Sequence, residues 1–260
     1  MTNKNDIMIR LENVSKTFYI RDKKHGSPLQ QLGRFFTGNN LRKIEAVKNV
    51  SIEIKRGEFI GIVGANGSGK STLLHLMSGV YKPDKGGISK IFGNYIRLSL
   101  GLGFNHELTA RENIYINASI MGLTFREIGR EFNKIIRFAE LEKFVDTKIK
   151  YFSRGMRARL AFAVAIYTNA EILLLDEFFG GVGDEKFREK SDQIFHKRIL
   201  AGKTIVLVSH NLLPVKDHAN RVMLMHEGEC VKTGTSEEVF LHYKNVLKVD
   251  QLKIEQKDLA

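Results

Sequence analysis

This 260-residue chain lacks the features that would mark it as something other than an ordinary globular enzyme. Its single cysteine, Cys230, rules out a disulfide framework within one chain and a metal site built from several thiolates. Only three prolines are present, too few for a proline-rich linker protein. No apolar stretch reaches the roughly 20 residues that span a bilayer, and the first ten residues lack the apolar core of a secretion signal. We therefore expect a globular protein of the cytoplasm, where a lone thiol stays reduced.

Acidic residues are also comparatively scarce. The chain has 41 Lys and Arg against 29 Asp and Glu, a formal net charge of +12. Residues 1–57 alone hold 12 basic and 5 acidic side chains, a net charge of +7. Such a balance attracts polyanions or the anionic inner leaflet of a membrane, and it equally fits a solvated basic surface. Charge alone does not choose between nucleic acid, membrane and a phosphate ligand.

Short apolar runs alternate with helical stretches along the chain. The runs at 59–63, 171–175 and 204–208 are apolar on both faces, which is typical of strands in parallel sheets. Helices are expected at 70–79, 109–121, 124–142, 155–168 and 184–201. This alternation predicts an α/β fold with a mostly parallel sheet.

Two regions depart from this alternation. Residues 7–14 and 48–54 alternate apolar and polar side chains, so we expect an N-terminal antiparallel β part there. A hairpin is expected over 221–233, turning at Glu227-Gly228. The block from about 109 to 152 has no strand pattern, so we interpret residues 109–168 as a helical subdomain inserted into the sheet domain.

A phosphate-binding pattern follows the first of the apolar runs. Gly64, Ala65, Asn66, Gly67, Ser68, Gly69, Lys70 and Ser71 fit G-x-x-x-x-G-K-[ST], between a strand and a helix, and Thr72 continues that helix. Glycines let successive backbone N–H groups point at phosphate oxygens, and the helix adds its positive N-terminal end. We expect Lys70 to neutralise the β- and γ-phosphates and Ser71 to bind Mg²⁺.

Two carboxylates end the apolar run at 171–175. Asp176 is well placed to hold Mg²⁺, and Glu177 to polarise an attacking water. The phosphate pattern alone leaves kinases, GTPases and ATPases open. The Asn-Lys-x-Asp element with which GTPases recognise their base is not found, which disfavours that class.

A third element narrows the class further. Residues 152–157 read Phe-Ser-Arg-Gly-Met-Arg and resemble the signature of the ABC ATPases, in the form seen in polysaccharide exporters. Gly183-Asp184 resembles the D-loop of that family, Ser209-His210 its switch histidine, and residues 13–18 its opening strand. The resemblance covers residues 7 to about 240, with every motif in the family's order. It implies a nucleotide-binding domain over 1–240 and leaves 241–260 as a helical tail.

The resemblance also implies roles for individual residues. Phe18 is expected to stack on adenine, with Tyr19 as the alternative, while His210 contacts the γ-phosphate and Asp184 belongs to the nucleotide site. Asn105 takes the place of a glutamine that senses Mg²⁺ and water, and its metal contact stays open because it is shorter.

Ser153 and Gly155 would cap the γ-phosphate held by another subunit. Ser153 is also a good N-cap by its chemistry, so a helix is expected to begin at 154 or 155. One chain supplies half of each site, so we expect a head-to-tail homodimer around two ATP molecules, with Lys70 and Glu177 catalytic in each.

The cargo is suggested by three features. The signature variant, the loop over 98–104 and an insert at 21–44 resemble ATPase subunits that export lipid-linked O-antigen, with capsule and teichoic-acid exporters close by. We expect a multi-span membrane permease as partner, indirect contact with polysaccharide, no nucleic acid, and a peripheral position on the cytoplasmic face of the inner membrane. An amphipathic helix over 27–38 in the insert would meet the membrane, or else cover the domain's own sheet edge. Another ABC cargo, or a soluble ABC ATPase acting on ribosomes or nucleic acid, is the alternative.

Overall fold

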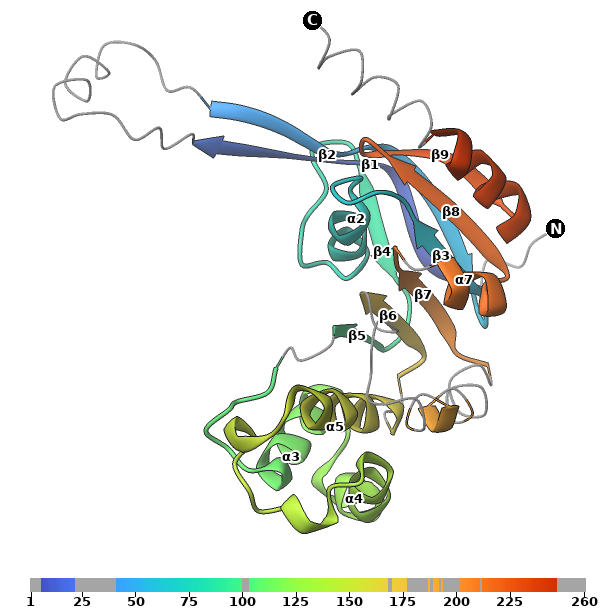
Figure 1. Cartoon of the computed structure of the whole chain (residues 1–260). Coiled ribbons are helices and arrows are strands. Elements are labelled where there is room, and N and C mark those ends of the chain that lie inside the picture. Colours follow the sequence, from blue (N-terminus) through green and yellow to red (C-terminus); the bar gives the residue numbers. More distant parts are fainter. Residues whose placement is uncertain are drawn as a thin grey trace, which may run out of the picture.

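A computed structural model provides the fold (Figure 1). It describes residues 6–21, 41–99, 103–167, 170–176, 202–210 and 212–246, together with 187, 189–191 and 193. The expected helix at 184–201 and the amphipathic helix expected at 27–38 lie largely or wholly outside these residues, as does the tail beyond residue 246.

The N-terminal part forms a three-stranded antiparallel sheet in the order β2-β1-β4. Strands β1 (Ile7–Arg21) and β2 (Leu41–Lys55) are paired along their whole length, and β4 (Ile88–Ile91) joins β1 at one end. The far ends of β1 and β2 project as a two-stranded ribbon (Figure 1). Both strands are longer than their alternating patterns predict, so Arg21 and residues 41–44, assigned to the insert, belong to this ribbon.

The second sheet has six strands in the order β5-β6-β7-β3-β8-β9. Its parallel members are β5 (Tyr95–Ser99), β6 (Ile172–Asp176), β7 (Thr204–Val208), β3 (Phe59–Val63) and β8 (Arg221–His226). Strand β9 (Glu229–Gly234) closes the edge antiparallel to β8. The mostly parallel α/β fold is therefore confirmed.

The turn of the terminal hairpin lies where the sequence predicts it. Glu227 and Gly228 both have positive φ, 45° and 86°, as a two-residue type I′ turn requires. Strands β4 and β5 were not predicted, because both are short and partly exposed, and the end of β5 was assigned to a loop.

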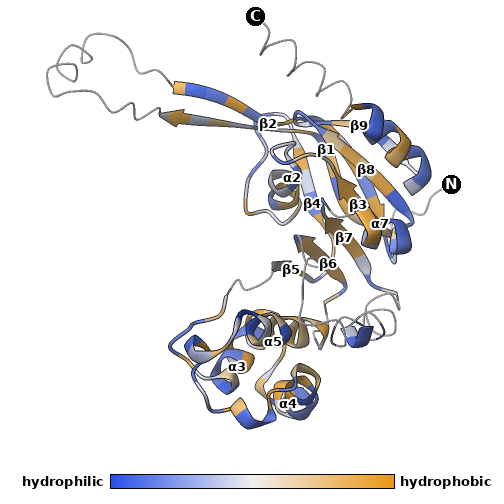
Figure 2. Cartoon of the chain, viewed as in Figure 1, coloured by the Kyte–Doolittle hydropathy of each residue, from blue (hydrophilic) through white to orange (hydrophobic). Residues whose placement is uncertain are grey.

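Both faces of the six-stranded sheet are buried. Along β6, Ile172 and Leu174 pack into a cluster shared with the antiparallel sheet and with α2 (Lys70–Met77). Leu173 and Leu175 point the other way, into a cluster shared with the helical subdomain. Figure 2 shows these central strands as the most apolar part of the chain. Burial on both faces explains why the central strands have continuous apolar runs.

Helices cover the remaining surfaces of the sheet domain. Helix α7 (Leu212–His218) packs on β3, and a further helix runs over residues 236–246. Within the part of the chain described, no helix combines the length and apolar character needed to cross a membrane.

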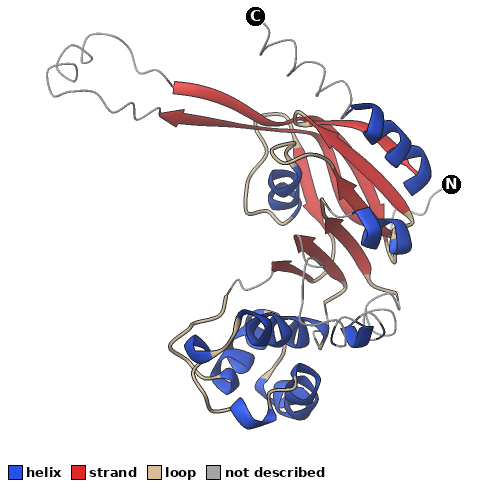
Figure 3. Cartoon of the chain, viewed as in Figure 1, coloured by secondary structure: helices blue, strands red, loops and turns tan. Residues whose placement is uncertain are grey.

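The helical subdomain is built from three capped helices (Figure 3). They are α3 (Ala110–Ile120), α4 (Phe125–Ala139) and α5 (Arg154–Ile166), with 3₁₀ turns at Glu142–Phe144 and Ile149–Tyr151. Thr109 and Thr124 form capping boxes with the glutamates three residues later, which fixes where α3 and α4 begin.

Candidate nucleotide-binding site

The phosphate loop lies between β3 and α2 and its backbone depends on glycine. Gly64, Gly67 and Gly69 have φ values of 152°, 80° and 100°. A Cβ atom on Gly64 would overlap the carbonyl oxygen of Met225, and one on Gly69 the carbonyl oxygen of Ala46. The loop is thus enclosed by β8 on one side and β2 on the other, with no room for side chains at these two positions.

The tip of the β8–β9 hairpin also fixes the loop. The backbone N–H of Gly228 donates to the carbonyl of Ser68 at 3.1 Å, and the N–H of Lys48 donates to the carbonyl of Gly228 at 2.8 Å. Three segments far apart in the sequence therefore hold one loop. Its amide groups are preorganised for a ligand rather than ordered by it.

Lys70 begins α2 and is buried, with 6% of its surface exposed. Its ammonium donates to the carbonyls of Gly64 and Ala65 at 2.9 and 2.8 Å. The buried Lys70 therefore places a positive charge inside the loop. The N-terminus of α2 adds a partial positive charge at the same point, so an anionic ligand is favoured there. This is the arrangement that neutralises a phosphate.

The next residue brings the loop to strand β6. The Ser71 hydroxyl donates to Oδ1 of Asp176 at 3.3 Å, and Asp176 is the last residue of β6. A hydroxyl and a carboxylate are oxygen donors of the kind Mg²⁺ prefers, so these two side chains fit that ion. His75, one turn along α2, is half-buried. Burial and the Arg97 cation lower the pKa of this imidazole, against the opposing effect of Asp176.

A cavity of about 630 Å³ opens beside the loop. Its lining comes from the phosphate loop, from β2 and from the hairpin tip. These residues are Asn66, Gly67, Gly69, Lys70, Ser71, Thr72, Ile44, Glu45, Ala46, Lys48 and Glu227. The volume suits a nucleotide-sized ligand. The β2 residues and Glu227 were not predicted, because only the pairing of distant strands brings them to the loop.

Phe18 lies on β1 opposite Ile44, one of the cavity residues. Tyr19, 65% exposed, is opposite Lys43, which does not line the cavity. The Phe18 ring packs edge-on against Tyr81, with centroids 5.3 Å apart, and is not itself part of the cavity lining. Between the two aromatic candidates for the adenine, this placement favours Phe18.

The carboxyl ends of β6, β7 and β3 meet at the same edge. Val208 is paired with both Asp176 and Ile62, and the buried Ser209 donates its N–H to the carbonyl of Ile62 at 3.2 Å. His210 follows directly and is exposed at this edge. Glu177 and Asp184 lie outside the residues that the structure describes.

Ser153 and Gly155 are in the other subdomain. The Ser153 hydroxyl accepts the backbone N–H of Met156 at 3.1 Å, which makes it the N-cap of α5, and the helix begins at Arg154 as expected. Among the described residues, a Cβ on Gly155 would meet only the Ser153 hydroxyl, at 3.8 Å, so this part of the chain leaves the space beside Gly155 open. Neither residue hydrogen-bonds to the phosphate loop in the part of the chain described.

The arginines in the first two turns of α5 differ in their partners. Arg159 pairs with Glu140 at 2.9 Å. Arg154 and Arg157 make no ion pair with any residue that the structure describes, although they lie at a helix N-terminus, where cations are disfavoured.

Asn105 is held by the helical subdomain. Its carboxamide oxygen accepts the Glu107 N–H at 2.9 Å, and its own N–H donates to Oδ1 of Asn113 at 2.9 Å. Asn113, fully buried on α3, returns hydrogen bonds to the carbonyls of Asn105 and Thr109 at 3.0 and 2.8 Å. The structure therefore fixes the Asn105 loop to α3 rather than to Ser71 and Asp176. Asn113 was not predicted. The sequence feature that could have indicated its role is a polar residue at a position of α3 that is otherwise apolar.

These features define a nucleotide-binding α/β domain of the phosphate-loop class. A family model described as ABC transporter matches residues 47–180, more than half of the chain. The chain belongs to the ABC transporter family.

The relatives include named proteins of several bacteria. The chain is 36% identical over 254 residues to a "Teichoic acids export ATP-binding protein TagH" of Bacillus anthracis, covering 96% of this chain and 45% of that one. It is 38% identical over 206 residues to an "O-antigen export system ATP-binding protein RfbB" of Klebsiella pneumoniae, covering 79% of this chain and 83% of that one. The chain thus spans less than half of the first relative and most of the second.

Among solved structures, the ATP-binding cassette MJ0796 in a dimeric post-hydrolysis state bound to ADP and Pi matches with a TM-score of 0.68. The match is 27% identical and covers 88% of this chain and 99% of that one. An "ATP binding subunit of ABC transporter" matches with a TM-score of 0.71 at 20% identity, over 95% and 98% of the two chains, and supports the fold alone.

Proposed function

We propose that this chain is the ATP-hydrolysing subunit of an ABC exporter that moves a lipid-linked polysaccharide across the inner membrane. The observation that carries the proposal is the buried Lys70 in its glycine loop, next to the Ser71–Asp176 pair and a nucleotide-sized cavity. Relatives named for teichoic-acid and O-antigen export support the cargo class. O-antigen is the cargo we favour, because the signature and the loop over 98–104 resemble those exporters.

In the proposed reaction, water attacks the γ-phosphorus of ATP as the bond to the β,γ-bridging oxygen breaks, so ADP leaves and phosphate is formed. Lys70 exchanges its two carbonyl partners for phosphate oxygens, and the loop amides hold the transferring group. Ser71 and Asp176 would hold Mg²⁺, which when bound neutralises charge on the phosphates. Glu177 orients and deprotonates the water, and His210, at the same sheet edge, contacts the γ-phosphate.

The site needs a second copy of the chain. Ser153 and Gly155 are at the N-terminus of α5, separate from the phosphate loop, and no described residue fills the space beside Gly155. In a head-to-tail homodimer each α5 N-terminus would face the γ-phosphate held by its partner, as a capped helix end favours. The dimeric state named for the MJ0796 cassette supports this arrangement. A multi-span permease completes the exporter and places the ATPase pair on the cytoplasmic face.

Teichoic acid is the second candidate cargo, since a TagH protein matches across nearly the whole chain.

Two measurements test the proposed function. ATP hydrolysis is measured on the permease complex in detergent, and export is measured in cells that lack the chromosomal copy of this gene. Lys70→Ala should lower ATP hydrolysis by at least about 100-fold and leave polymer off the cell surface. Lys85→Ala, an exposed lysine outside the cavity, is the control and should change neither. Normal hydrolysis by Lys70→Ala, or export unaffected by its loss, would contradict the proposal, and the polymer that accumulates identifies the cargo.

A further inference from the structure

Helix α4 has a row of basic side chains on its solvent face. Arg126, Arg130, Lys134 and Arg137 are all exposed and follow one another at intervals of four, four and three residues. At 3.6 residues per turn they fall within an arc of about 80° and extend about 16 Å along the helix. The apolar side chains of α4 lie on the opposite side, in the core of the subdomain. We call these four residues the basic stripe.

The acidic residues of α4 form an ion pair with only one member of the stripe, Lys134. Glu127 accepts hydrogen bonds from the backbone and hydroxyl of Thr124 at 2.7 Å in the capping box, and Glu131 pairs with Lys134 at 2.9 Å. The three arginines of the stripe make no ion pair with any residue that the structure describes. Three guanidinium groups therefore face solvent together without an ion pair to a described residue. The Thr124 hydrogen bonds lower the pKa of Glu127, and the nearby Arg130 charge lowers it further.

The stripe suits a flat anionic surface. Its three arginines lie in a row on the exposed face of α4, so all of them can meet one plane of negative charge. Anionic lipid headgroups present such a plane and attract exposed basic side chains. A nucleic acid would also attract the arginines, so its binding is measured in the test below.

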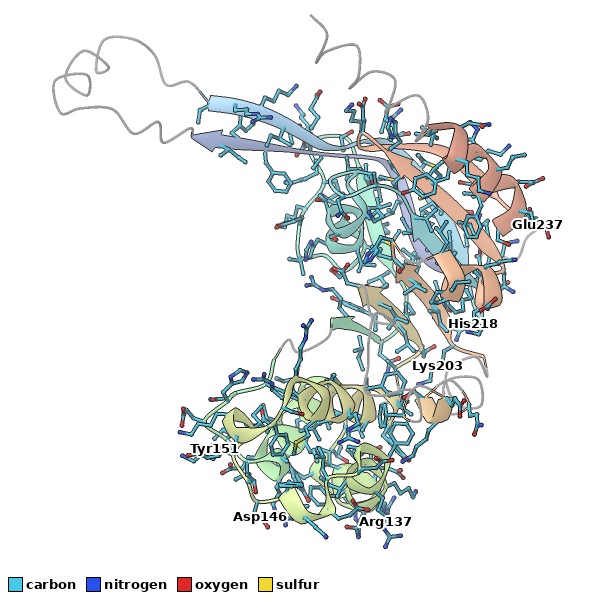
Figure 4. All side chains as sticks on the ribbon, in the orientation of Figure 1. Arg137, Asp146, Tyr151, Lys203, His218 and Glu237 are labelled. Carbon is cyan, nitrogen blue, oxygen red and sulfur yellow. The ribbon has the colours of Figure 1, made fainter. Side chains whose placement is uncertain are left out.

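The stripe is remote from the nucleotide site. In Figure 1, α4 lies on the side of the helical subdomain away from α2, and Arg137 points away from the body in Figure 4. No residue of the candidate site is on α4. The stripe can therefore be changed without touching the machinery of ATP hydrolysis.

We propose that the basic stripe binds an anionic phospholipid surface. The inference rests on the proposed function, because the ATPase of a membrane exporter works beside the negatively charged cytoplasmic leaflet. Each exposed cation near such a leaflet strengthens binding about fivefold, so the three arginines together contribute about 100-fold.

The test is sedimentation of the full chain with vesicles of phosphatidylcholine, with and without phosphatidylglycerol. The variant Arg126→Gln/Arg130→Gln/Arg137→Gln is compared with Lys82→Gln/Lys85→Gln/Lys90→Gln. The control removes the same charge from exposed lysines that make no ion pair with the described residues. Thermal melting of all proteins checks that they are folded.

We expect the unaltered chain to bind only the phosphatidylglycerol vesicles, the arginine variant to bind about 100-fold more weakly, and the lysine variant to bind much as before. Equal weakening in both variants would assign the attraction to overall charge and overturn the proposal. An arginine variant that keeps vesicle binding but loses binding to single-stranded RNA would also overturn the proposal. ATP hydrolysis on the same samples tests the proposed function separately: vesicle binding without hydrolysis contradicts that function alone, and hydrolysis without vesicle binding contradicts the stripe alone.

Discussion

The sheet domain and the helical subdomain hold their functional residues in different ways. In the sheet domain the phosphate loop is enclosed by backbone from β2 and β8, so its shape is set by contacts that tolerate no side chain. In the helical subdomain Ser153 and Asn105 are placed by side-chain hydrogen bonds at helix ends. The phosphate loop is held by contacts within the described part of the chain, whereas the α5 N-terminus makes no hydrogen bond to that loop among the described residues. We therefore propose that the α5 N-terminus meets a ligand held by a second copy.

The largest effect should come from adding one methyl group to the enclosed loop. Gly69→Ala would force a Cβ against the carbonyl of Ala46 at a φ of 100°, so we expect loss of nucleotide binding and destabilisation of about 3 kcal/mol. Gly67→Ala also has positive φ but meets nothing within 4 Å, so it should destabilise the protein by about 1 kcal/mol. Urea unfolding measures the stability of each variant, and ATP titration measures its nucleotide binding. Equal losses in the two variants would show that backbone strain, rather than the lack of space around Gly69, causes the loss.

The next effect concerns the buried amide of the helical subdomain. Asn113→Leu would leave the Asn105 N–H without its acceptor, and the carbonyls of Asn105, Leu108 and Thr109 would each lose one of two hydrogen bonds. We expect destabilisation of about 1–3 kcal/mol. Asn133→Leu, on the exposed face of α4, is the control and should change stability by less than about 0.5 kcal/mol. A small effect at Asn113 would mean that the Asn105 loop is held by other contacts.

A third comparison separates capping from catalysis. Ser153→Ala and Thr124→Ala each remove an N-cap hydroxyl, so each should lower stability by about 1 kcal/mol. Only Ser153→Ala should also lower ATP hydrolysis, because Thr124 is on the helix that we place away from the nucleotide. Thermal unfolding and phosphate release measure the two effects. Equal losses of hydrolysis would reduce Ser153 to a structural cap.

The smallest effect is a dependence of stability on pH, which comes from His75 near the Ser71–Asp176 pair. Burial and Arg97 lower the pKa of His75, so the folded protein favours the neutral imidazole. Its contribution to stability is present above the ordinary histidine pKa of about 6.5 and is lost as the pH falls through the lowered value. We expect His75→Gln to weaken the loss of thermal stability between neutral and acidic pH. An identical pH profile in the variant would show that His75 does not contribute.

The same comparison explains what sequence reasoning could reach. The phosphate loop, the Asp176 strand and the Ser153 cap were predictable because glycine, apolar runs and capping residues act over a few neighbouring positions. Glu45, Lys48 and Glu227 were not, because the pairing of β1 with β2 and the β8–β9 turn bring them to the cavity from distant parts of the chain. Asn113 was missed because its partners lie in an irregular loop whose shape no pattern specifies.

The central claim is that two copies of this chain close around ATP, each supplying Ser153 to its partner's phosphate loop. Light scattering of Glu177→Gln, which should bind ATP without hydrolysing it, tests this claim most directly. We expect the mass to double when ATP and Mg²⁺ are added, and the double variant Glu177→Gln/Ser153→Glu to stay a monomer while it still binds ATP. A Glu177→Gln protein that binds ATP and remains monomeric, or a double variant that dimerises equally well, would contradict the account.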